Sequence, residues 1–179
     1  MRFLLEFGSM RKPIAKNKFF SPTKGHLNFN QMVEEIFAFM ESLPEREYEI
    51  IVGCDSSSGI EPFFPIAVVV LRKGSGGRFF LQKVKYHKRK FYNLHQRILE
   101  EVYLSCDLAL LLREKIQEEY LKRKSNLKYQ FKYIHADVGE NGVTKDMIKE
   151  VVGLIRGNGF EAKIKPEAYV ATVVADRYT

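Results

Sequence analysis

The chain has 179 residues, of which 45% are hydrophobic and 28% are charged, and its formal net charge is +7. This composition is near the average for globular proteins and argues against a disordered or membrane-spanning chain; with only Cys54 and Cys106, it also argues against a disulfide framework or a cysteine-based zinc site. One domain of this length buries roughly two thirds of its unfolded surface, which is enough for a hydrophobic core without disulfides.

Residues 1–27 show neither helical nor strand periodicity and are expected to form an N-terminal arm ahead of a single domain over residues 28–179. The apolar run at the start is short and is interrupted by Glu6, so it predicts no signal peptide. No stretch approaches the roughly 18 apolar residues of a membrane span. The expected location is therefore the cytoplasm, with no membrane partner.

A helix and three strands are predicted in the first half of the domain. The helix follows Asn28 or Asn30 as its cap and ends before Pro44, because apolar side chains recur every three or four residues. These side chains are Val33, Ile36, Phe37, Met40 and Leu43. Runs of β-branched and aromatic residues over 48–55, 62–72 and 78–87 predict strands, joined by short turns into an antiparallel meander.

The second half alternates helices with strands. Helices are predicted over 93–124, over 144–156 with Thr144 as cap, and over 167–177; strands are predicted over 129–137 and 160–166. Strands joined through crossover helices are parallel. The expected fold class is therefore α/β, with a mixed five-stranded sheet flanked by helices and preceded by an N-terminal helical extension.

The positive charge is concentrated in one block, since no Asp or Glu lies between Pro62 and Leu99. The block contains Arg72, Lys73, Arg78, Lys83, Lys85, Lys88, Arg89, Lys90 and Arg97. Such a surface suits nucleic-acid phosphates, and Lys83, Lys85, Lys88, Arg89 and Lys90 are the candidate contacts. The alternative is a solvated basic face that serves solubility alone.

Two acidic residues end predicted strands. Asp55 follows the first strand and Asp137 follows the fourth, and ligands of open α/β sheets bind beyond the carboxyl ends of the strands. If the strands are parallel neighbours about 4.8 Å apart, the carboxylates repel each other unless a cation lies between them. Magnesium or manganese fits this donor set. In the alternative interpretation both residues only cap turns.

Two helices can add further carboxylates to this pair. Glu101 lies beside the apolar seam of the long helix and is expected to point toward the sheet edge, whereas Glu100 is expected to face solvent. Asp176 follows an apolar run near the end of the terminal helix, where an exposed surface acid is also common. Ser56 is expected to orient Asp55, and His135 to be either a neighbour of the metal ligands or a satisfied interior residue.

Other motifs do not complete their patterns. The sequence after Asp137 looks like a calcium loop, but Ile148 stands at its twelfth position, where a bidentate Glu belongs. The serines after Asp55 do not form a nucleophile elbow, and the glycine-rich turn at 73–77 joins two strands where a phosphate loop would open a helix.

The arrangement is similar to the ribonuclease H superfamily, and the segments FFSPTKG, VGCDSS, RILEEVYLS, IHADVGENG and IKPEAYVATVVADR resemble the YkuK-type ribonuclease-H-like family of bacterial proteins. The likeness extends from about Phe19 to the end of the chain. It implies two divalent ions held by acids that correspond here to Asp55, Glu101 or Glu100, Asp137 and Asp176. Three serines follow Asp55, where ribonucleases H usually have Gly-Ser.

These features predict a metal-dependent nuclease that hydrolyses phosphodiester bonds of RNA, an RNA–DNA hybrid or structured DNA, with Asp55, Glu101, Asp137 and Asp176 as catalytic metal ligands. The alternative is a non-catalytic nucleic-acid-binding or regulatory module on the same fold. A nucleotide-binding ATPase of the wider superfamily is a weaker third hypothesis, because it would need paired phosphate loops and about twice this length.

Overall fold

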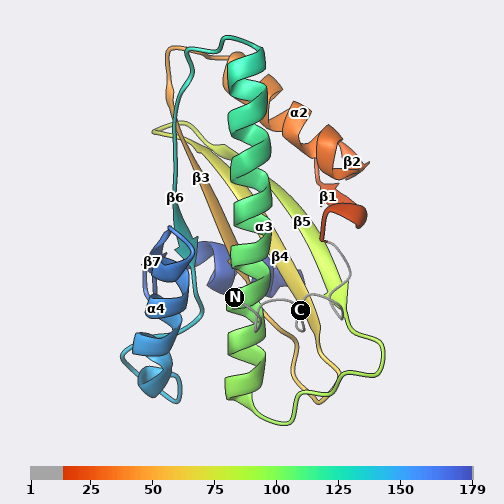
Figure 1. The fold of residues 1–179 in the computed structure, drawn as a ribbon, viewed down its shortest axis with the longest axis vertical. Coiled ribbons are helices and arrows are strands. Elements are labelled where there is room, and N and C mark those ends of the chain that lie inside the picture. Colours follow the sequence, from red (N-terminus) through yellow and green to blue (C-terminus); the bar gives the residue numbers. More distant parts are fainter. Residues whose placement is uncertain (1–13, 179) are drawn as a thin grey trace.

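The computed structural model describes residues 14–178, which form a seven-stranded mixed sheet with helices on both faces (Figure 1). The strand order is β2-β1-β5-β4-β3-β6-β7. The strands are β1 (Phe19–Ser21), β2 (Gly25–Leu27), β3 (Glu47–Cys54), β4 (Phe63–Arg72), β5 (Gly77–Lys85), β6 (Lys128–His135) and β7 (Glu161–Lys163). The helices are α2 (Phe29–Glu41), α3 (Leu94–Lys122) and α4 (Ile148–Gly157), with shorter turns η1 (Ile14–Lys16), η2 (Lys145–Met147), η3 (Val170–Ala175) and η4 (Asp176–Tyr178).

The five predicted strands form the centre and one edge of the sheet. β4 pairs antiparallel with both β3 and β5. On the other side of β3, β6 pairs parallel with β3, and β7 pairs parallel with β6. The mixed α/β architecture is therefore confirmed.

The expected count of five strands is wrong, because β1 and β2 form a hairpin within the predicted arm. This hairpin extends the sheet through the antiparallel pairing of Phe20 with Leu81 on β5. Strands of three residues are too short to show an alternating pattern, and for this reason the sequence did not reveal them. Residues 1–13 of the predicted arm lie outside the described part of the chain.

The two faces of the sheet are covered by different elements. In Figure 1, α3 crosses one face along its length, while η3 lies behind the sheet. The larger core cluster includes Ile50 and Val52 of β3 with Leu108 of α3, and a smaller cluster joins Ile51 of β3 to Val170 of η3. Alternate residues of β3 therefore serve opposite faces, which explains why the strand is apolar throughout.

The structure differs from the sequence-based expectations at the ends of two helices and in the last helical segment. Asn28 and not Asn30 caps α2, in a capping box with Gln31, and Leu43 lies beyond the helix and is 36% exposed. The Thr144 side chain makes no capping hydrogen bond, and a 3-10 turn precedes α4. The predicted terminal α-helix is instead a π-helical segment, η3, followed by the 3-10 turn η4.

Both cysteines are buried, as expected for small interior residues. Within residues 14–178, no helix combines the length and apolar character needed to cross a bilayer.

Candidate active site

Asp55 and Asp137 lie at the same end of two neighbouring parallel strands. Gly53 of β3 pairs with His135 of β6, and Asp55 and Asp137 each lie two residues beyond this pair. The Asp55 N–H donates to the Pro65 carbonyl at 3.1 Å, which continues the ladder between β3 and β4 beyond Cys54. The expected juxtaposition of these two strand ends is present.

Asp55 is held in an environment that disfavours its negative charge. Burial raises its pKa to about 7, and the charge of Asp137 together with a hydrogen bond and the charge of Asp176 contribute to the rise. The backbone N–H of Ser56, hydrogen-bonded to the carboxylate, opposes the rise. The last turn of the chain thus brings Asp176 against Asp55, although Asp176 itself is exposed.

Glu101 joins this group from the first turns of α3. Its side chain is 4% exposed, and Ser56 Oγ donates to Glu101 Oε1 at 2.6 Å. Burial raises its pKa well above the usual range, and the charges of Asp55 and Asp137 raise it further, whereas Arg97 lowers it. Four carboxyl groups from β3, α3, the β6 end and η4 therefore share one region of negative potential.

The expectation that Glu100 is exposed is wrong. Glu100 does not face solvent: it is 1% exposed, accepts a hydrogen bond from the Tyr86 hydroxyl, and pairs with Arg89 Nη2 at 2.8 Å. Because α3 lies against both the sheet and the β5–α3 loop, two neighbouring faces of the helix are covered, at Glu101 and at Glu100. A single apolar seam in the sequence does not indicate the second covered face. Ser56 directs its hydroxyl to Glu101, and only its backbone N–H serves Asp55.

Lys165 is a site residue that the sequence analysis missed. Its Nζ lies 2.8 Å from Asp137 Oδ1, an ion pair that lacks the geometry of a hydrogen bond, so Oδ1 remains buried without a donor. Lys165 follows β7, whose parallel pairing with β6 brings its carboxyl end to the same edge. A positional signal was therefore present, since Lys165 is the next-to-last residue of the fifth predicted strand, near the same end as Asp55 in the first.

His135 is an interior residue. It is 1% exposed, its Nδ1 accepts a hydrogen bond from the Val170 N–H at 3.2 Å, and its ring packs edge-on against Tyr169. The accepting Nδ1 places the proton of the neutral ring on Nε2, which has no partner. Burial lowers the pKa of His135 to about 4, and the charge of Lys163 lowers it further, so this ring is neutral at physiological pH.

The terminal segment that carries Asp176 packs unusually close to β3. A Cβ atom on Gly53 would lie 2.7 Å from the Ala171 backbone nitrogen and 3.0 Å from the Val170 carbonyl carbon. Glycine at this position therefore permits η3 to approach the strand. This packing fixes the start of η4 near Asp55.

The donor chemistry fits a hard divalent cation, since all four groups offer carboxylate oxygens and Asp137 Oδ1 is buried without a hydrogen-bond donor. The grouping is incomplete: among residues 14–178, no three His, Cys, Asp or Glu side chains are arranged to hold a metal ion. Ion binding therefore requires the carboxylates to rotate toward one another and Lys165 to release Asp137.

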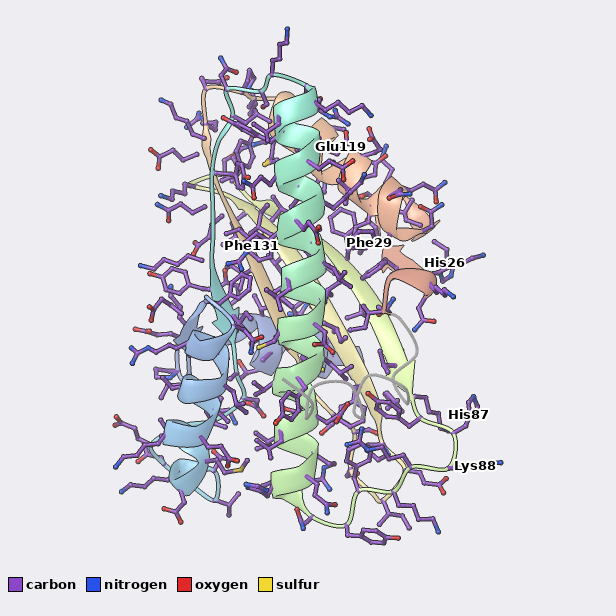
Figure 2. All side chains as sticks on the ribbon, viewed as in Figure 1. His26, Phe29, His87, Lys88, Glu119 and Phe131 are labelled. Carbon is purple, nitrogen blue, oxygen red and sulfur yellow. The ribbon has the colours of Figure 1, made fainter. Side chains whose placement is uncertain are left out.

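The predicted phosphate contacts differ in their availability. Lys83, Lys85, Lys88 and Lys90 are exposed, and Figure 2 shows Lys88 beside His87 in the loop between β5 and α3. Arg89 forms an ion pair with Glu100. It also lies over the ring of Phe91, with its guanidinium carbon 4.7 Å from the ring centroid. It therefore stabilises this loop.

No solved structure matches the chain. Over 168 residues it is 27% identical to "Uncharacterized protein YkuK" of Bacillus subtilis (strain 168), an alignment that covers 90% of this chain and 96% of that protein. A family model described as "Ribonuclease H-like" matches residues 31–179. Since this match covers most of the chain, including all four acidic positions, the chain belongs to the ribonuclease H-like family.

Proposed function

We propose that this protein hydrolyses phosphodiester bonds of nucleic acid with the help of magnesium or manganese. The observation that carries the proposal is the convergence of Asp55, Glu101, Asp137 and Asp176. Burial raises the pKa of Asp55 to about 7, and the charges of Asp137 and Asp176 contribute to the rise. Carboxyl groups gathered in a buried site are neutralised either by protons or by cations, and a divalent ion would favour their charged forms. Membership of the ribonuclease H-like family supports nucleic acid as the partner.

Asp55, Glu101, Asp137 and Asp176 would hold the ions. When bound, divalent ions in such a site stabilise negative charge on the phosphodiester and lower the pKa of an attacking water. Ser56 orients Glu101 through its 2.6 Å hydrogen bond, so that one carboxylate oxygen stays fixed. Lys165 neutralises Asp137 in this structure, and its ammonium would be available to a phosphate oxygen if an ion took its place at the carboxylate.

The second candidate is a nucleic-acid-binding module without catalysis. The ion pair between Lys165 and Asp137 favours it, because a permanent ammonium at this carboxylate would take the place of a metal ion. This candidate and the nuclease share the basic surface, and they differ only in whether the carboxylates are used.

Cleavage of a panel of substrates decides between the two. We would incubate the protein and its Asp55→Asn variant, purified identically, with manganese and labelled single-stranded RNA, hybrid duplex, double-stranded DNA or a four-way junction. Asp55→Asn keeps the side-chain volume but removes a charge that the ions require. We expect wild-type cleavage of at least one substrate, a loss of at least 100-fold in the variant, and retained binding.

Equal cleavage by both proteins would contradict the assignment of Asp55, since a contaminant or another site would then be responsible. Absence of cleavage by wild type, with binding intact, would favour the binding module. As a second readout, millimolar magnesium or manganese should raise the melting temperature of wild type, and Asp137→Asn should remove most of that increase.

A further inference from the structure

A hollow of about 440 Å³ lies on the sheet between β1, β2 and β5, outside the acidic site. It is lined by Lys18, Phe20, His26, Leu81 and Lys83. The pairing of Phe20 with both His26 and Leu81 puts these side chains on one face of the sheet. The hairpin that sequence analysis did not detect therefore builds one wall of this hollow.

The lining combines aromatic surface with positive charge. Phe20 is half-buried and its ring centroid lies 5.7 Å from that of His26, while Lys18, His26 and Lys83 are exposed. Among residues 14–178, no acidic side chain lines the hollow. An apolar floor with aromatic walls and a cationic rim is complementary to a base whose flanking phosphates carry the negative charge.

The hollow lies in line with the acidic site on the same face. Lys83 pairs with Pro65 of β4, and the Pro65 carbonyl accepts the Asp55 N–H, so the three residues form one row across the sheet. Two strand spacings separate Lys83 from Asp55, or about 10 Å. Leu81 also belongs to the core cluster that contains Val170 and Ala175 of η3, the segment that leads to Asp176.

We infer that the hollow binds an unpaired base of a nucleic-acid strand that runs from Lys83 to the carboxylates, with Lys18 and Lys83 contacting its phosphates. This inference rests on the proposed action on nucleic acid and narrows its substrate to one with a single-stranded segment. At about 3.4 Å per nucleotide, the rise of one strand in B-form DNA, the separation of about 10 Å corresponds to about three nucleotides between Lys83 and the phosphodiester at Asp55.

Binding of a labelled 12-nucleotide single strand in EDTA tests the inference without cleavage. The double variant Phe20→Leu/His26→Ala removes both rings but keeps an apolar side chain at the half-buried position. We expect it to weaken binding roughly 5- to 100-fold, as loss of base stacking does. Phe131→Leu is the matched control, because Phe131 packs against Phe160 on the other face of the sheet, far from His26 in Figure 2.

A second variant, Lys18→Ala/Lys83→Ala, changes only exposed side chains and guards against a folding defect in the first. We expect weaker binding and a smaller salt dependence. Photocrosslinking with 5-iodouracil placed at successive positions should join the base to Phe20 or His26 at one position only.

Wild-type affinity in both double variants would overturn the inference, even if manganese-dependent cleavage is present and the proposed function stands. Binding that depends on Phe20 and Lys83 without any cleavage would support the hollow and refute the nuclease. Loss of affinity in Phe131→Leu equal to that in Phe20→Leu/His26→Ala would also overturn the inference, because the aromatic effect would not be specific to this face.

Discussion

At the scale of single residues, Asp55 links the acidic site to the stability of the fold. Its pKa rises from 3.8 to about 7 on folding, so between about pH 4 and pH 7 the folded protein binds more protons than the unfolded chain. The contribution of Asp55 to the free energy of unfolding must therefore fall as pH rises through this range. The Asp55→Asn variant lacks this titrating group. We therefore expect the free energy of unfolding of the variant, minus that of wild type, to increase from pH 5 to pH 8. Urea unfolding in EDTA measures this difference.

His135 acts in the opposite direction but does not disturb this comparison. Its pKa falls from 6.5 to about 4 on folding, so its contribution to stability grows as pH rises through that interval. Because both proteins contain His135, its effect cancels in the difference. A difference that is constant from pH 5 to pH 8 would contradict the burial of a protonated Asp55.

The sequence predicts the location of a site residue where that location depends only on the residue's position along one strand or helix. Asp55 and Asp137 were predictable because both directly follow strands. The roles of Glu100 and Ser56 were not, since they depend on the Tyr86–Arg89 loop and on the distance between α3 and β3. Helical periodicity describes one buried seam, and it carries no information about a second element packed on the neighbouring face.

At the scale of elements, β3 and η3 approach each other closely at Gly53, where a side chain would collide with the backbone of η3. Gly53→Ala would place its Cβ 2.7 Å from the Ala171 backbone nitrogen, and a backbone atom cannot rotate away. We expect a loss of about 1–3 kcal/mol in the free energy of unfolding. Displacement of η3 should also move Asp176, and it should lower any manganese-dependent cleavage.

Gly153→Ala provides the control for this prediction. Gly153 lies within α4, and a Cβ there would meet nothing within 4 Å. Replacing glycine in an exposed helix should stabilise the protein by about 0.5–1 kcal/mol. Equal effects of the two substitutions in urea unfolding would show that η3 does not pack against Gly53 as described.

The strands and helices themselves were predictable to different degrees. The meander β3–β4–β5 and the long helix α3 have patterns that run over many residues, and each was predicted within a few residues of its bounds. β1 and β2 were missed because three residues cannot establish a period. The π-helical segment η3 packs against Gly53, a tertiary contact that is invisible in the local sequence.

At the scale of the whole molecule, the basic block should determine how binding depends on salt. Lys85, Lys88 and Lys90 are exposed, whereas Arg89 pairs with the buried Glu100 and is best left intact. We expect Lys85→Ala/Lys88→Ala/Lys90→Ala to lower the log–log slope of affinity against salt by about 0.7 to 0.9 for each lost phosphate contact. Fluorescence anisotropy at several salt concentrations measures this slope.

The control removes the same charge elsewhere. Lys122, Lys124 and Lys128 are exposed at the end of α3 and the start of β6, at the opposite end of the long helix from the carboxylates. Lys122→Ala/Lys124→Ala/Lys128→Ala should leave the slope close to that of wild type. If both triple variants change it equally, net charge alone governs binding and the basic block has no special role.

The parallel pairing of β3 with β6 also has a consequence for the order in which the molecule assembles. β3, β4 and β5 are joined by short turns, whereas β6 reaches β3 only after the whole of α3 has been made and folded back. Distant pairings form later than local ones, since a long loop must first close. A chain emerging from the ribosome therefore acquires its basic strands before Asp137 and Asp176 exist, so the proposed binding of nucleic acid would become possible before the proposed cleavage.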